Sequence, residues 1–142
     1  MAIPTRPPTA AELLANPVVV QSMEDAWTDS QVNDPNNRLE EGGWIYLDLL
    51  TGDIKIQRAP AGERSSLSLG NPPLLTDHVI VGTFHTHPNP ASQGWETGPS
   101  TQDEKAANFT GVPWLIRAED GDHHTGPDSR RGGLVGGPGY PP

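Results

Sequence analysis

Three short apolar segments, residues 43–50, 79–84 and 112–117, stand out along the chain because they are rich in bulky or β-branched side chains. Such segments are typical of β-strands. In residues 53–57 isoleucine alternates with polar residues, which predicts a further, half-buried strand. Only 33% of the 142 residues are hydrophobic, and 16 are glycine and 16 proline. The sequence therefore predicts one domain with no sizeable second core.

Two helices are predicted before the first strand. Thr9 and Glu12 have the spacing of a capping box, and the helix that they begin should end near Asn16, because a proline disfavours helical geometry in the residue before it. Pro17 then suits the first position of a second helix, although its valine run also fits a strand. The residues expected on one face of this helix are Val18, Val19, Met23, Ala26 and Trp27. A third helix is expected from Ser100 to about residue 109.

The predicted domain organisation has three parts. Residues 1–8 contain three prolines and suggest an extended arm. Residues 9–120 carry the helical and strand patterns and form the single predicted domain. Apolar periodicity is lost after that, so residues 121–142, rich in glycine and proline towards the end, are expected to be a flexible tail.

Charge and composition exclude several classes of function. The formal net charge is −9, which argues against a nucleic-acid or anionic-membrane partner, because such surfaces need clustered lysine and arginine. No apolar run approaches the ~20 residues of a membrane span, and the N-terminus lacks the apolar centre of a secretory signal. We expect a cytoplasmic location. The chain has no cysteine, so any metal must be held by histidines and carboxylates.

The segment His85-Thr86-His87-Pro88 follows the second apolar run directly. In a strand, residues i and i+2 project to the same face, so the two imidazoles should lie side by side. Neutral imidazole is a common zinc ligand, and catalytic zinc sites usually have three protein ligands. The pair is therefore a partial metal site that needs a third donor, although two solvated histidines would show the same pattern.

Two carboxylate motifs could complete such a site. Ser100 and Asp103 have helix-capping spacing, and a carboxylate in the first helical turn can also face a metal. Glu40 and Glu41 precede two glycines, which permit close backbone approach. A free carboxylate beside a metal-bound water is the usual general base of a hydrolytic zinc site, whereas the simpler interpretation is a solvated acidic pair.

Taken in order, Glu40-Glu41-Gly42-Gly43, His85-Thr86-His87-Pro88 and Ser100-Thr101-Gln102-Asp103 resemble the motifs of the JAB/MPN (JAMM) metalloprotease family. The resemblance covers roughly residues 38–118. The Glu-Gly-Gly-Trp-Ile-Tyr start is similar to bacterial JAB-like domains attached to polymorphic toxins and related conflict systems. The resemblance implies an α/β fold: a curved mixed β-sheet flanked by helices, in the layout shared with cytidine-deaminase-like proteins.

The resemblance also implies roles. His85, His87 and Asp103 would bind zinc (Zn²⁺) with water as fourth ligand, Glu40 would be the general base, and Ser100 would help to stabilise the tetrahedral intermediate. The implied reaction is hydrolysis of a peptide or isopeptide bond in a protein or peptide substrate, with ubiquitin-like proteins included.

The chain departs from the family pattern at two points. Twelve residues separate His87 from Ser100, more than is usual in the family, so an inserted loop over residues 89–99 is expected to overhang the cleft. Glu41 would be the base if the register slipped by one residue.

Two other functions remain as alternatives: a non-catalytic binding module with the same fold, and, ranked last, a metal phosphoesterase, which would need many more ligands. Retention of all five motif positions argues against the binding module. His78 is expected to lie at a strand end, His123 and His124 to be solvated, and Trp95 is a candidate substrate contact. The oligomeric state is not predicted.

Overall fold

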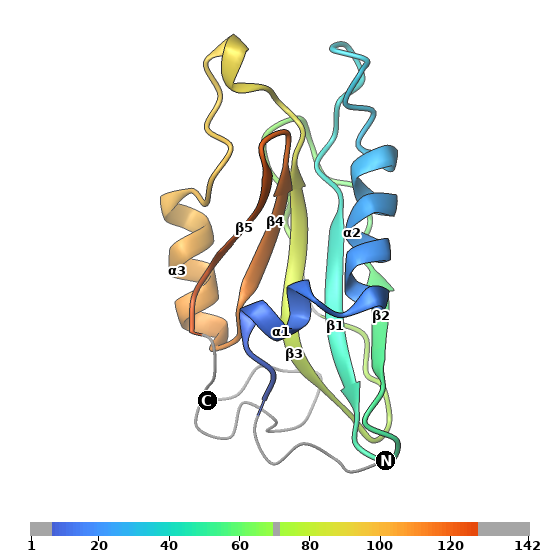
Figure 1. Cartoon of the computed structure of the whole chain (residues 1–142). Coiled ribbons are helices and arrows are strands. Elements are labelled where there is room, and N and C mark those ends of the chain that lie inside the picture. The colour runs from blue at the N-terminus through green and yellow to red at the C-terminus, as the bar shows by residue number, and fades with distance from the viewer. Residues whose placement is uncertain (1–6, 70–71, 128–142) are drawn as a thin grey trace.

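The computed structural model describes residues 7–69 and 72–127. They form an α/β fold in which helices flank a five-stranded mixed sheet with the strand order β2-β1-β3-β4-β5 (Figure 1). This confirms the predicted fold class. The elements are α1 (Ala10–Leu14), α2 (Pro17–Asp29), β1 (Gly42–Asp48), β2 (Ile54–Arg58), β3 (His78–His87), a 3₁₀ turn (Ala91–Gln93), α3 (Thr101–Thr110), β4 (Trp114–Ala118) and β5 (Gly121–Thr125). Among the described residues, no helix has the length and apolarity needed to span a membrane.

Both N-terminal helices begin where the caps predict. In α1, the Glu12 N–H donates to Thr9 Oγ1 at 3.1 Å, and the Thr9 N–H donates to Glu12 Oε1 at 3.0 Å. The valine run after Pro17 lies in α2, so the strand alternative is wrong. The expected apolar face holds for the buried Val19, Met23 and Ala26, but Val18 is 47% exposed and does not belong to it.

β3 lies at the centre of the sheet and extends through both histidines. It pairs antiparallel with β1 and parallel with β4. Pro88 ends the ladder, because proline has no N–H to donate. Gly42 pairs with His85, and a Cβ at Gly42 would lie only 2.2 Å from the Phe84 carbonyl oxygen. Glycine therefore lets β1 start directly beside the end of β3.

The predicted domain end at residue 120 is wrong. Gly121–Thr125 forms β5, which pairs antiparallel with β4 at the edge of the sheet. The sequence Gly-Asp-His-His-Thr shows no apolar alternation and so gave no strand signal. An edge strand can be held by main-chain pairing without burying apolar side chains. Gly126 and Pro127 follow β5 outside any helix or strand, and residues 128–142 of the predicted tail lie outside the described part of the chain, as do residues 1–6 of the predicted arm.

Among the described residues, two groups of buried apolar side chains form the core. In the larger group, side chains of α1 and α2 pack against side chains of the sheet. This group includes Leu13, Met23, Ile45, Val81 and Phe84. The smaller group is formed by Trp44, Tyr46, Ala59, Ile80 and Val112. α3 lies alongside β5 (Figure 1). β1 and β3, beside whose ends the histidine and glutamate motifs lie, thus contribute to both core groups.

Candidate metal centre

Four side chains from three elements meet at one end of the sheet. Glu40 lies two residues before β1, His85 and His87 end β3, and Asp103 lies in the first turn of α3. β1 and β3 run antiparallel, so the start of one lies beside the end of the other. Residues 88–100 return the chain from β3 to the start of α3. The topology thus gathers motifs that are up to 63 residues apart in the sequence (Glu40 to Asp103).

The two imidazoles and the Asp103 carboxylate converge on one point. His85 Nε2 and His87 Nε2 are 3.1 Å apart. His85 Nε2 is 3.3 Å from Asp103 Oδ1, and His87 Nε2 is 3.3 Å from Asp103 Oδ2. Tetrahedral coordination at the Zn–N and Zn–O distances found in proteins places neighbouring ligand atoms about 3.3 Å apart. The two nitrogens have this spacing, and each of them lies at the same distance from one Asp103 oxygen, so the two histidines and the carboxylate could hold a divalent metal ion.

Glu40 lies beside the same two histidines. The ligand atoms of Glu40, His85 and His87 lie within 4.8 Å of one another, a spacing that could also hold a metal ion. Asp103 contacts both imidazoles at shorter range, so we take Asp103 as the third ligand and Glu40 as the neighbouring carboxylate. Glu40 is 6% exposed and His85 is 4% exposed.

Asp103 caps its helix and faces the histidines at the same time. Its N–H donates to Ser100 Oγ at 3.0 Å, and its Oδ2 accepts the Ser100 N–H at 2.9 Å. The capping and metal-binding interpretations are therefore compatible. Ser100 Oγ is the acceptor of the Asp103 N–H, so the proton of the Ser100 hydroxyl remains available for another acceptor.

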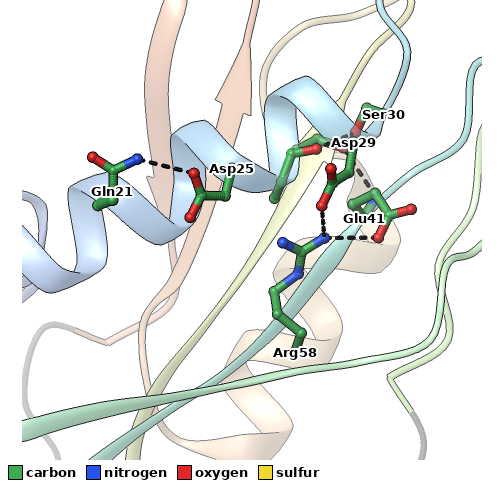
Figure 2. Close-up of polar contacts among 8 residues, drawn as sticks. Gln21, Asp25, Asp29, Ser30, Glu41 and Arg58 are labelled. Carbon is green, nitrogen blue, oxygen red and sulfur yellow. Dashed lines mark hydrogen bonds and ion pairs between the residues drawn. The ribbon is translucent and has the colours of Figure 1, made fainter.

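Glu41 points to a different partner. Its Oε1 lies 2.8 Å from Arg58 Nη2, which is also 3.1 Å from Asp29 Oδ2 (Figure 2). Adjacent side chains of an extended segment point in opposite directions, so only one of the two glutamates can face the histidines. The structure turns Glu40 towards the histidines and Glu41 towards Arg58.

Burial and charge shift the pKa values of these groups. Burial raises the pKa of Glu40 to about 8, with a smaller opposing effect from His87 and a smaller reinforcing one from Asp103. Burial alone would lower the pKa of His87, but the hydrogen bond to Asp103 and the nearby carboxylates outweigh it and raise that pKa. Burial would raise the pKa of Asp103, yet its hydrogen bonds with both histidines hold it well below its usual range.

We expect the metal-free protein to lose stability as pH rises from about 5 to 8. Folded Glu40 keeps its proton until about pH 8, whereas the unfolded chain releases it near 4.5, so the unfolding free energy falls across this window. The loss should be on the order of 3 kcal/mol, measured by urea denaturation in chelator at several pH values. Glu40→Gln should flatten most of the slope. Equal slopes in the variant and the wild type would contradict the assignment.

The inserted loop orients one of the histidines. His87 Nδ1 lies 3.3 Å from the Thr97 carbonyl oxygen, which favours the tautomer with Nδ1 protonated and Nε2 free to bind a metal. Thr97 Oγ1 donates to Asp120 Oδ2 at 2.9 Å, so the turn between β4 and β5 anchors the loop. For His85 Nδ1, no hydrogen-bond partner is found in the described part of the chain. Sequence reasoning missed Thr97 because it acts through its main-chain carbonyl.

A cleft of about 860 Å³ opens at the site. Glu40, His87 and Asp103 line it together with the segment 65–69 and one face of α3. The inserted loop, which was expected to overhang the cleft, lines part of its wall, and Trp95 within it is 38% exposed.

The other histidines lie elsewhere. His78 begins β3 at the opposite end of the strand, 3.8 Å from Asp48. His123 Nε2 is paired with Asp120 Oδ1 at 2.8 Å, and His124 is exposed.

No protein-family model matches the chain, and none of the curated proteins matches it.

Proposed function

We propose that this protein is a zinc-dependent hydrolase of amide bonds, a JAMM-type metallopeptidase or isopeptidase of the JAB/MPN class. The observation that supports the proposal most strongly is the set of separations between 3.1 and 3.3 Å among His85, His87 and Asp103, with the buried Glu40 beside them. A structural ion site would not need an additional buried carboxylate. A hydrolytic site needs one as general base.

In this proposal, zinc bound by His85, His87 and Asp103 supplies Lewis-acid polarisation and lowers the pKa of water. Glu40 accepts a proton from the attacking water and later delivers it to the leaving amine. Its raised pKa of about 8 in the metal-free site falls when a cation is near, because positive charge favours the carboxylate. The pKa of Glu40 then lies closer to neutral pH, where the carboxylate can both take up and release a proton.

Ser100 has a separate role in the proposal. Its hydroxyl proton can be donated to the oxyanion that develops on the substrate carbonyl, and the capping hydrogen bonds hold the residue in place. Because α3 carries both Ser100 and Asp103 at its start, one helix end positions the donor and the ligand together.

The proposed substrate is a protein or peptide, with ubiquitin-like proteins as one candidate class. The cleft has room for a peptide segment, and Trp95 and Phe109 line it with apolar surface that remains 38% and 83% exposed. A cytoplasmic location, and delivery as part of a larger conflict system, stay predictions.

Peptide cleavage by the zinc-loaded protein tests the proposal. The protein is incubated with a mixed-sequence peptide library and with ubiquitin-like conjugates, and the products are identified by mass spectrometry. We expect cleavage that a zinc chelator stops and added zinc restores. Zinc binding without cleavage of any substrate would instead support the non-catalytic binding module.

A further inference from the structure

Thr86 lies between the two histidines of β3 and is fully buried. Successive side chains of a strand point to opposite faces, so its hydroxyl faces away from both imidazoles. There it lies 2.6 Å from Ser30 Oγ and 3.0 Å from the Glu41 N–H nitrogen. Thr86 thus connects the end of α2 with the segment that carries Glu40.

The directions of these hydrogen bonds follow from counting protons. Ser30 Oγ donates its one proton to the Ala26 carbonyl oxygen at 2.8 Å, so it must accept from Thr86. The Thr86 hydroxyl in turn accepts the Glu41 N–H. The Thr86 N–H also donates to the Glu41 carbonyl oxygen at 2.9 Å. Thr86 therefore binds both main-chain polar groups of Glu41.

The same segment is held from its other side as well. The Glu40 N–H donates to the Glu63 carbonyl oxygen at 2.7 Å, and the Glu40 carbonyl oxygen accepts the Gly62 N–H at 2.8 Å. The Glu41 side chain is held by Arg58, which also contacts Asp29 (Figure 2). The last turn of α2 and its cap, Asp29 and Ser30, thus reach Glu41 through its side chain and through its main chain.

We infer that Thr86 is a positioning residue that fixes the Glu41 peptide unit and thereby holds the Glu40 carboxylate beside His85 and His87. Its catalytic consequence rests on the proposed function. Loss of the hydroxyl would leave the partly buried Glu41 N–H without its acceptor and free the segment to shift. A displacement of about 1 Å in a catalytic group can lower the rate by about 100-fold.

The test compares Thr86→Val with Thr86→Ser and with the matched control Thr83→Val. Thr83 is also buried in β3, but its hydroxyl has no hydrogen-bond partner within the described residues. The measurements are amide hydrogen exchange at Glu41, zinc stoichiometry, kcat and KM. We expect Thr86→Val to speed Glu41 exchange at least about 10-fold and to lower kcat about 10- to 100-fold, with KM and zinc stoichiometry unchanged. Thr86→Ser should restore the wild-type exchange rate at Glu41 and the wild-type kcat. Thr83→Val should match the wild type in all four measurements.

Unchanged exchange at Glu41 in Thr86→Val would overturn the inference, as would a serine variant that is as impaired as the valine variant. If Thr86→Val does not fold, Ser30→Ala takes its place: it removes the acceptor of the Thr86 proton, and faster Glu41 exchange is again expected. Unchanged exchange there would also overturn the inference. If the wild-type protein cleaves no substrate, the proposed function fails, while hydrogen exchange still decides the positioning role.

Discussion

His87→Ala is expected to remove zinc from the protein. The substitution leaves His85 and Asp103 as the only members of the three-donor set, and structural or catalytic zinc sites need at least three protein ligands. Elemental analysis of the wild-type protein, prepared with zinc available, should give one zinc per chain. The variant should give close to none, with affinity lowered at least about 100-fold, since the loss even of residues that only support a ligand costs 10- to 100-fold.

His123→Ala is the matched control for this measurement. His123 is also a strand histidine in contact with a carboxylate, Asp120, but it lies outside the cluster at the end of β3. The control should bind zinc as the wild type does. Full zinc retention in His87→Ala, or zinc loss in His123→Ala alone, would contradict the assigned site.

Glu40→Gln is expected to keep zinc and lose cleavage. Glutamine has nearly the same shape as glutamate but cannot carry the proton, and general acid–base catalysis contributes about 10²- to 10⁴-fold to a rate. We expect a fall in kcat of that size, measured on a peptide that the wild type cleaves, with zinc stoichiometry still one per chain.

Glu41→Gln serves as the control for Glu40→Gln, because its side chain contacts Arg58 instead of the histidines, and the glutamine carbonyl oxygen can still accept the hydrogen bond from Arg58. Its kcat should stay within a few-fold of the wild type. If Glu41→Gln lost most of its kcat while Glu40→Gln stayed active, Glu41 would be the general base instead of Glu40. Zinc loss in Glu40→Gln would make Glu40 a ligand, through the alternative set that it forms with His85 and His87.

Local signals in the sequence predicted most of the fold. The capping box at Thr9 and the proline at position 17 located two helix starts, because caps and proline act through short-range sterics and hydrogen bonds. β5 was missed for the opposite reason. It is polar and held by main-chain pairing to β4, so its side chains carry no periodic signal.

The candidate site was predictable only in part. The spacing of His85 and His87 directly indicates a shared face, and the spacing of Ser100 and Asp103 indicates a helix start. Glu41 turns to Arg58, 17 residues further along the chain, while Glu40 lies on the side of the histidines, and no local pattern reports such a contact. The same holds for hydrogen bonds made by main-chain carbonyls such as that of Thr97.

Anomalous diffraction at the zinc edge, from crystals of the wild-type protein grown with zinc, tests the metal centre most directly. We predict one anomalous peak at about 2.0–2.2 Å from His85 Nε2, His87 Nε2 and an Asp103 oxygen. A structure with no zinc between the two imidazoles, or with the Asp103 carboxylate turned away from a bound ion, would contradict the account.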